Sequence, residues 1–544
     1  MSLCQCIIGW RQDADKKNPG FQVNPHVFYV SAVLVLFFVS IGVFFTKRLS
    51  EIFGTFQNTI VVNFGWFYIL SVAFFLLFVI WLYFSPYGSI RLGKDSDRPE
   101  YKDTTWFAML FSAGMGIGLL FYSVAEPILH FASPRDAAPG TIEAAVEAVN
   151  LSFFHWGLHA WAIYTVVGLS LAYFSYRHDM PLTIRSTMYP LFGDRIYGIR
   201  GNIVEVLAIF GTLFGVATSL GLGVMQINAG MDYLGLMSVS INNQILLIVF
   251  ITLAATTSVI SGLNRGIRIL SQVNILLGLA LVIFVFIVGP SVFLLSSFVQ
   301  SIGYYLQNIV YLTFQTDAFT GLEWQKMWTM FYWGWWISWS PFVGMFIARV
   351  SRGRTIREFI RGVLLVPAIV TFIWIIVFGN TAIHMEVFGN GGIVNAVQTS
   401  IPTALYVLLD KLPGSLISSA LATIVVMTFF VTSSDSGSLV ISILSSGGNP
   451  KPAIPLRLFW SLLQGAVAAV LLLTGGVVGL QTAALTTALP FCVVLILMCY
   501  SISKGLKAEY DGKRVIDSEK KPPENTSNNK AKQLVGELFE GGSK

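Results

Sequence analysis

Apolar segments of about 20 residues recur along nearly the whole chain, and short polar stretches separate them. A transmembrane α-helix needs about 20 mostly apolar residues, and unpaired backbone is excluded from the lipid interior. The pattern predicts an all-α polytopic membrane protein with about twelve transmembrane helices. The predicted spans are residues 26–46, 64–85, 105–131, 151–176, 202–229, 242–262, 269–290, 328–349, 357–380, 414–444, 456–475 and 484–503.

Two longer connections and two tails complete this organisation. Residues 47–63 and 291–314 mix polar and apolar positions, so both are predicted to lie along the membrane surface. Residues 1–25 and 504–544 are predicted tails on either side of a transmembrane domain, residues 26–503. The C-terminal tail is polar and lysine-rich, which indicates a partly disordered segment.

Composition and loop charge support a membrane location. The 544 residues are 55% hydrophobic and only 11% charged, too little charge to cover a soluble protein of this size. Basic residues gather in the loops after even-numbered spans, which places both termini in the cytoplasm. We therefore expect a multi-pass protein of a bacterial cytoplasmic (inner) membrane, with lipid and not nucleic acid around it. The four cysteines lack the spacing of a metal site or a disulfide.

The segment 332–361 is rich in tryptophan and arginine. Its tryptophans are Trp333, Trp335, Trp336 and Trp339. Tryptophans also form belts at the membrane surface, but these are crowded just before a helix breaker, Pro341. Indole faces are the best side-chain partners for a quaternary ammonium group. We interpret the segment as part of a cage for a methylated cation, on a helix interrupted near Gly334 and Pro341.

The predicted span 151–176 offers a second aromatic wall. Trp156, Trp161 and Tyr164 recur at helical spacing. Such aromatics are more often packing residues, and only the pairing with the tryptophans of the span 328–349 makes them candidates for the cage. His155 and His159 lie one turn apart, and without a third ligand we expect them to be polar packing groups.

Glycines interrupt the predicted span 105–131. Gly114, Gly116 and Gly118 alternate, and each costs about 1 kcal/mol of helix stability relative to alanine. Close packing of helices through small residues is one interpretation; an unwound stretch that presents backbone groups to a substrate or ion is the other. Broken helices that open two five-span groups, residues 105–290 and 328–503, are typical of a secondary transporter.

Hydroxyl groups are concentrated in the span 414–444. Thr432 and Ser433 are candidate ligands of a hard cation, because so many polar groups in a membrane must face the protein interior. Asp435 is either a further ligand or a structural acceptor. Glu126 could attract a cation or cap a helix, and we favour a structural role. The sequence shows neither the nucleophile–base or metal set of an enzyme nor the soluble output domain of a sensor.

Taken together, these residues resemble the betaine/choline/carnitine transporter (BCCT) family. The segment 333–360, WGWWISWSPFVGMFIARVSRGRTIREFI, carries the most specific likeness, and the resemblance covers nearly all predicted spans. It implies a leucine-transporter-like fold, with inverted repeats at about residues 105–290 and 328–503 after two extra N-terminal helices. It also implies a homotrimer and no cofactor.

The resemblance assigns residues to substrate and ion. The family's aromatic box falls on Trp156, Trp161, Tyr164 and Trp336, with Trp335 and Trp339 adjacent. The backbone of the glycine stretch adds Gly114, Met115, Gly116 and Gly118 to the substrate site. The sodium site implied by the family comprises backbone oxygens of Ser112, Met115 and Phe429 and the hydroxyls of Thr432 and Ser433.

Two positions bear on substrate and stoichiometry. The sequence GMGIG at 114–118 resembles the sodium-coupled betaine porters, whereas many proton-coupled choline carriers have aspartate in place of Gly118. A second sodium site of the family uses two threonines one turn apart; Thr212 fits, but Val216 does not. The implied function is a sodium-coupled symporter for glycine betaine or a related trimethylammonium osmolyte, which works by alternating access. The alternative is a choline or carnitine transporter of the same family, sodium-independent or proton-coupled.

Overall fold

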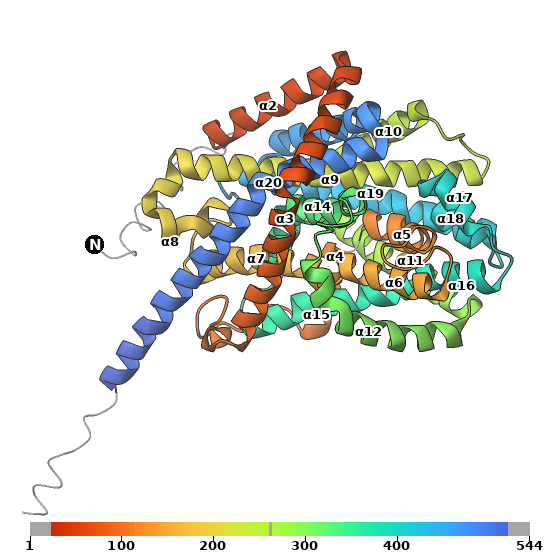
Figure 1. Cartoon of the computed structure of the whole chain (residues 1–544). Coiled ribbons are helices and arrows are strands. Elements are labelled where there is room, and N and C mark those ends of the chain that lie inside the picture. Colours follow the sequence, from red (N-terminus) through yellow and green to blue (C-terminus); the bar gives the residue numbers. More distant parts are fainter. Residues whose placement is uncertain (1–22, 115, 261–263, 521–544) are drawn as a thin grey trace, which may run out of the picture.

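The structure is a computed structural model that describes residues 23–114, 116–260 and 264–520. Most of these residues form helices that pack in one bundle, with α14 (Thr329–Val350) in its middle, while the C-terminal end of α20 (Ile454–Lys520) projects away from it (Figure 1). Within these ranges, β-type pairing is limited to an isolated antiparallel bridge between Arg91 and Thr355. The described part of the chain therefore confirms the all-α class.

Two helices precede the glycine-rich region. Helix α2 (Pro25–Phe44) begins with a proline at its first turn, and α3 (Thr46–Phe84) follows almost directly. Residues 47–63, predicted as a connection along the membrane surface, are not separated from the following span but form the first part of α3. Their position at the membrane surface stays a prediction. No proline interrupts the stretch, and Thr55 and Thr59 each donate a hydrogen bond to the carbonyl four residues before, which satisfies polar side chains within the helix.

The glycine stretch breaks its helix as predicted. Helix α4 (Asp103–Gly114) ends within the stretch, and α5 (Ile117–Ala132) begins after it. Gly116 has extended backbone, φ −158° and ψ −157°, and its carbonyl accepts the first hydrogen bond of α5. Met115 lies outside the described residues. The break thus leaves backbone groups without the partners that a continuous helix would give them.

A second break lies in the next span, where none was predicted. Helix α6 (Ile142–Trp156) and helix α7 (Leu158–Ala172) meet at Gly157, and the π-helix η2 (Tyr173–Arg177) continues α7. A Cβ at Gly157 would lie 2.4 Å from the Phe153 carbonyl oxygen and 2.8 Å from the Phe372 ring. Only glycine fits this approach, and the break directly follows Trp156.

Helix α14 is continuous through Gly334 and Pro341, so the predicted interruption of this span was wrong. Proline has no N–H for the carbonyl four residues before it, but the Ser340 hydroxyl donates to the Ile337 carbonyl at 2.7 Å instead. Gly334 serves close packing, because a Cβ there would lie 2.9 Å from the Leu485 Cα. The matching break expected in the second half of the chain is therefore not found in α14.

The remaining helices cover the other predicted spans. They are η1 (Pro86–Ser89), η3 (Arg185–Met188), α8 (Tyr189–Phe192), η4 (Gly193–Tyr197), α9 (Ile199–Tyr233), α10 (Ile241–Ile260), α11 (Asn264–Val288), α12 (Ser291–Phe314), α13 (Glu323–Met327), α15 (Ile356–Ile375), η5 (Ile376–Asn380), α16 (Thr381–Phe388), α17 (Ile393–Thr399), η6 (Ile401–Thr403), α18 (Ala404–Asp410), α19 (Ser415–Ser445) and α20 (Ile454–Lys520). Gly476, at φ 54°, separates the two spans predicted within α20.

Length and hydropathy identify the membrane-crossing helices among the described residues. Seven helices are long and apolar enough to cross a membrane, or up to eight if the bent pair 272–288 and Ser291–Phe314 forms one span. The two members of that pair meet at 108°, and α12 carries exposed apolar residues. The surface position expected for 291–314 stays a prediction. The count of twelve spans and the inverted repeat stay predictions. The protein is a multi-span membrane protein.

Candidate functional site

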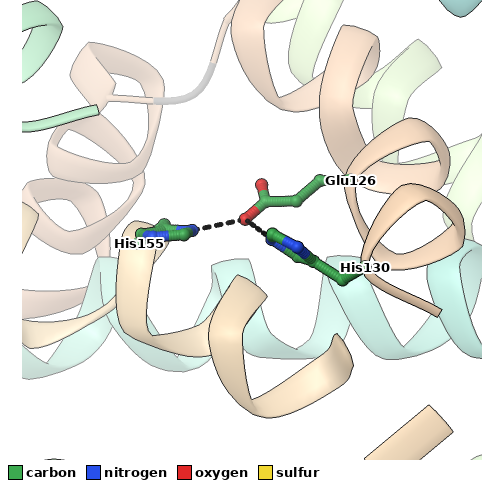
Figure 2. Close-up of side chains that lie close together, drawn as sticks. All are labelled: Glu126, His130 and His155. Atoms are coloured by element: carbon green, nitrogen blue, oxygen red, sulfur yellow. Dashed lines mark hydrogen bonds and ion pairs between the residues drawn. The ribbon is translucent and has the colours of Figure 1, made fainter. Parts of the chain in front are cut away.

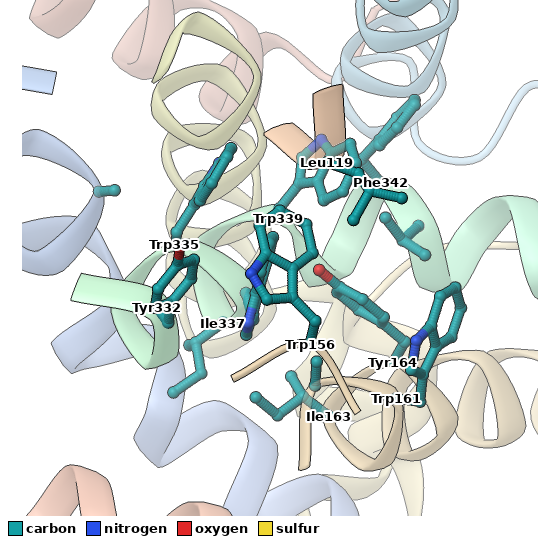
Figure 3. Close-up of a cluster of buried hydrophobic side chains, with 14 of the residues drawn as sticks. Leu119, Trp156, Trp161, Ile163, Tyr164, Tyr332, Trp335, Ile337, Trp339 and Phe342 are labelled. Carbon is teal, nitrogen blue, oxygen red and sulfur yellow. The ribbon is translucent and has the colours of Figure 1, made fainter. Parts of the chain in front are cut away.

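Three helices bring the predicted cage residues together. Trp156 ends α6, Trp161 and Tyr164 lie on α7, and Trp336 lies on α14. The Trp156 and Trp336 rings are 4.9 Å apart at 67°, and Tyr164 lies 5.4 Å from Trp161 and 6.4 Å from Trp336, also edge to face. Figure 3 shows Trp156, Trp161 and Tyr164 in this cluster. All four side chains are buried. The structure thus gathers these aromatic faces in one place between the helices.

The two adjacent tryptophans extend the cluster along α14. Trp335 stacks on Trp336 at 4.7 Å and 17°, and Trp339 lies 6.3 Å from Trp336. Figure 3 labels Trp335 and Trp339 in the cluster. The Trp335 indole N–H donates to the Gly215 carbonyl at 3.3 Å, and that of Trp336 donates to the His155 carbonyl at 2.9 Å. These bonds fix the orientation of both rings. The N–H lies in the plane of the ring, so its hydrogen bond leaves the ring faces to other contacts, here the stacking of Trp335 on Trp336.

The fourth tryptophan of α14 lies apart from this cluster. Trp333 packs edge to face on Phe154 at 5.2 Å and stacks on the His159 ring at 5.6 Å. The Nε2 atom of His159 forms a hydrogen bond with the Thr313 hydroxyl at 2.8 Å. His159 is therefore a polar packing group, as expected.

Two tyrosines that were not predicted as cage residues also belong to the cluster. Tyr122 on α5 lies 6.4 Å from Trp156 and 6.3 Å from Trp335, and Tyr332 lies 5.7 Å from Trp336. Tyr332 precedes Trp336 by one helical turn, a spacing that could have revealed it. Tyr122 comes from a different helix, so only the packing of α5 against α14 and α6 identifies it.

The buried carboxylate of Glu126 contacts this cluster through hydrogen bonds to Trp156 and Tyr332. One oxygen of Glu126 accepts hydrogen bonds from His155 Nδ1 at 2.7 Å and from His130 Nε2 at 3.3 Å (Figure 2). The other oxygen accepts from the Trp156 indole N–H at 2.7 Å and from the Tyr332 hydroxyl. Glu126 thus holds residues of two helices in fixed positions, which agrees with the structural role expected for it.

Glu126, His130 and His155 lie close enough together to be considered as ligands of a metal ion. One ligand atom each from Glu126, His130 and His155 lies within 4.8 Å of the others. The carboxylate oxygen already accepts a hydrogen bond from each imidazole, and the far nitrogen of His155 bonds the Thr329 hydroxyl at 3.0 Å. This geometry is that of a buried hydrogen-bond network, in which His130 Nδ1 has no hydrogen-bond partner among the described residues.

The glycine break borders the aromatic cluster. A Cβ at Gly118 would lie 2.4 Å from Trp335 Cη2 and 3.2 Å from Trp156 Cη2, whereas a Cβ at Gly116 would meet nothing within 4 Å. Gly118 is therefore in direct contact with the tryptophan rims. Gly114 ends α4 on the other side of the break.

The residues assigned to sodium lie on two helices that approach each other. Gly116 and Phe429 line one cavity, so the break faces α19. Thr432 is buried, donates its hydroxyl to the Thr428 carbonyl at 3.0 Å, and accepts from the Asn274 amide at 3.4 Å. Ser433 is half-buried next to it. The other assigned ligands are Ser112 in the last turn of α4 and Met115, outside the described residues.

Asp435 and the pair Thr212 and Val216 were also considered as parts of an ion site. Asp435 accepts a hydrogen bond from Arg457 at 3.2 Å, which favours its role as a structural acceptor. Thr212 and Val216 are both buried on α9. The Val216 methyl groups lie 3.2 Å from where a Cβ of Gly437 would stand, so this position presents hydrocarbon to its neighbours and no oxygen.

The fold and the site together define a class of protein. Buried aromatic rings inside a bundle of apolar helices, with the indoles of Trp156, Trp335 and Trp336 oriented by hydrogen bonds, suit the binding of an organic cation within the membrane. That is the arrangement of a membrane transporter and not of an enzyme.

Comparison with known proteins gives the family. Residues 26–511 match the BCCT model, described as betaine/carnitine/choline family transporter, so the chain belongs to the BCCT family. It is 44% identical over 502 residues to the "Glycine betaine transporter" of Acinetobacter baylyi, covering 92% of this chain and 76% of the relative. It is 45% identical to "Glycine betaine transporter OpuD" of Bacillus subtilis, over 89% of this chain and 94% of the relative. The "High-affinity choline transport protein" of Escherichia coli is 40% identical, over 90% of this chain and 73% of the relative.

Family membership confirms two predictions made from the sequence. The resemblance to BCCT transporters was correct, and the protein is a transporter, not an enzyme. The relatives' names also support a quaternary ammonium compound as the class of substrate.

Proposed function

We propose that this protein is a sodium-coupled symporter that imports glycine betaine or a related trimethylammonium osmolyte. The observation that carries the proposal is the aromatic cluster of Trp156, Trp161, Tyr164 and Trp336, which is buried between membrane helices. A trimethylammonium group carries a positive charge spread over methyl groups and donates no N–H hydrogen bond. Aromatic faces attract such a cation without needing a hydrogen bond from it, by about 2 kcal/mol or more per desolvated contact.

The helix break supplies a partner for the opposite end of a zwitterion. Betaine carries a carboxylate a short distance from its ammonium group, and the first N–H groups of a helix have no partner within the helix. Helix α5 begins at Ile117, and Gly118 touches the rims of Trp335 and Trp156. In the proposed complex the carboxylate meets the amides of residues 114–118 while the cage holds the ammonium group. The positive end of the helix dipole adds to this attraction.

Sodium coupling is proposed for the opposite side of the same break. The backbone oxygens of Ser112, Met115 and Phe429 and the hydroxyls of Thr432 and Ser433 would form an oxygen shell that suits a hard cation. Support comes from the closeness of the break to α19, since Gly116 and Phe429 both border one apolar cavity. Because one short backbone segment would serve both substrate and ion, binding of either would order the segment for the other. Sodium would thereby stabilise the substrate-ready state.

The remaining features of the proposal follow the family. They are twelve spans with inverted five-helix repeats, alternating access around a fixed site, a homotrimer, and a bacterial cytoplasmic membrane with both termini inside the cell. One sodium site is proposed, because Val216 replaces the second threonine that a second site would use.

Uptake measurements test the proposal. Purified protein in proteoliposomes would be given labelled betaine, choline or carnitine, with and without an inward sodium gradient. We expect betaine to accumulate fastest and only with the gradient, and a potassium gradient of the same size is the control. Equal uptake without sodium would refute the coupling. Faster choline or carnitine uptake would replace betaine with the alternative substrate, to which the similarity with a choline transporter gives weight.

A further inference from the structure

A cavity of about 390 Å³ lies next to the helix break, outside the aromatic cluster. Residues of α4, α5, α11, α15 and α19 line it. Its inner wall includes Gly116, Leu120 and Phe429, and its outer wall includes Leu279 and Ile373. Apart from the Asn274 carboxamide and the indole nitrogen of Trp374, the lining side chains are hydrocarbon. Such a wall offers a ligand dispersion contacts and little else.

The mouth of this cavity opens onto the lipid-facing surface. Leu279 on α11 is 51% exposed and Ile373 on α15 is 41% exposed, although both line the cavity. The neighbouring residues Leu276 and Ile369 are exposed as well. Helix α15 lies in a segment that is long and apolar enough to cross a membrane, and residues 272–288 of α11 belong to the bent pair that also meets this test. The surroundings of the mouth are therefore the acyl chains of the bilayer.

We infer that the cavity binds one acyl chain of a membrane phospholipid, which enters between α11 and α15 and reaches the helix break. Water is a poor occupant, because a water molecule needs two to four polar partners and the lining offers few. A betaine zwitterion is also a poor occupant, because its charges would be buried without partners. An acyl chain fits the apolar lining, and its source lies at the mouth.

The inner end of the cavity connects this site to the proposed ion site. Gly116 precedes the first turn of α5, and Asn274, fully buried, donates to the Thr432 hydroxyl at 3.4 Å. An acyl chain that packs against Gly116 and Phe429 would support the unwound backbone from the membrane side. This second part rests on the proposed function: occupancy should then change how much sodium is needed for uptake.

Photo-crosslinking tests occupancy directly. Wild-type protein would be reconstituted in vesicles that contain a phospholipid with a diazirine on one acyl chain, and crosslinked residues would be mapped by mass spectrometry. Leu120 is only 1% exposed, so a chain must enter the cavity to reach it. We expect crosslinks at Leu120 and Phe429 as well as at the exposed Leu276. Crosslinks confined to Leu276 and other outer residues would overturn the inference.

A cavity-filling variant gives the matched comparison. Gly278 lines the cavity, and a Cβ there would lie 3.6 Å from the Trp374 ring, an ordinary contact, so Gly278→Leu should fill the space. Gly303→Leu on α12, where a Cβ meets nothing within 4 Å, makes the same change elsewhere. We expect Gly278→Leu to lose the inner crosslinks several-fold and Gly303→Leu to keep them. Equal inner crosslinking in both variants would refute the site.

The crosslinking measurements are independent of transport. Crosslinking needs neither substrate nor sodium, so a negative result would leave the proposed symport intact, and a failure of sodium coupling would leave the lipid site intact. The linked effect is measured separately, as the sodium concentration for half-maximal betaine uptake in Gly278→Leu and Gly303→Leu. A shift in Gly278→Leu alone supports the connection between cavity and ion site, and equal values in the two variants contradict it.

Discussion

Gly118 allows a sharp test of how the helix break and the aromatic cluster depend on each other. In Gly118→Ala the new Cβ would lie 2.4 Å from Trp335 Cη2, whereas carbon atoms pack at about 3.5–4.0 Å. Trp335 must therefore retreat by about 1 Å or more. It has little freedom to do so, because it stacks on Trp336 and Phe331 and its N–H bonds the Gly215 carbonyl.

The expected magnitudes separate stability from binding. Overpacking costs about 1–3 kcal/mol, while replacing a helical glycine by alanine returns about 1 kcal/mol, so the variant should fold with at most a modest loss of stability. Displacement of Trp335 toward Trp336 disturbs one face of the cage. Loss of one desolvated cation–π contact is worth about 2 kcal/mol, which corresponds to roughly thirtyfold weaker betaine binding.

The measurement is betaine affinity by titration calorimetry, with thermal unfolding of the same sample. Gly116→Ala is the matched control, since it adds the same methyl group two residues away where nothing lies within 4 Å. We expect Gly118→Ala to bind weakly and Gly116→Ala to bind nearly as the wild type does. Wild-type affinity in Gly118→Ala, or an equal loss in both variants, would refute the proposed contact between break and cage.

A charged residue at Gly118 tests substrate choice. Gly118→Asp adds a carboxylate that repels the betaine carboxylate and attracts choline, and at a modest effective dielectric this is worth a few kcal/mol, on the order of one to three. Gly118→Asn has nearly the same shape without the charge, so the ratio of choline to betaine affinity should rise in the aspartate variant relative to the asparagine variant. Identical ratios would show that charge at this position does not select the substrate.

Three further predictions concern the cage, the ion site and the buried carboxylate. Trp336→Leu should weaken betaine binding by about 2 kcal/mol, while Trp66→Leu, on a residue that is 58% exposed, should not; equal affinities would place the cage elsewhere. Thr432→Ala combined with Ser433→Ala should raise the sodium concentration for half-maximal uptake while thermal unfolding changes little, and an unchanged sodium dependence would remove both hydroxyls from the ion site. Glu126→Gln places an NH2 among four donors and should lower stability by about 1–3 kcal/mol and weaken betaine binding; an unaltered melting temperature and affinity would show that this carboxylate does not hold the cage.

The helices themselves could be predicted well from the sequence. Apolar length is a local property, because each segment must satisfy its own backbone hydrogen bonds in lipid. Every predicted span accordingly coincides with helix in the described residues, and the glycine break falls at Gly116. The sequence also singled out the tryptophans of α14 and the aromatics of α6 and α7, because a high density of large aromatic residues at helical spacing is visible without a structure.

Local patterns were insufficient where a single hydrogen bond or contact decides the outcome. Pro341 predicted an interruption, but the Ser340 hydroxyl satisfies the carbonyl that proline leaves without a donor, and α14 continues. Gly157 looked unremarkable in sequence, yet the approach of Phe372 from another helix requires glycine there and breaks the span after Trp156. The deciding group is the preceding residue of the same helix at Pro341, and at Gly157 it includes a side chain of another helix.

Only the tertiary structure determined which residues share a site. Glu126 and Tyr332 are 206 residues apart and bond each other, and Asn274 reaches Thr432 across 158 residues. Such pairs depend on how the helices pack, and nothing in the spacing along the chain encodes the partner. The sequence by itself therefore determined that helices cross a membrane and carry aromatic rings and a break, whereas the packing of α5, α6, α7 and α14 decided that those rings meet next to one buried carboxylate.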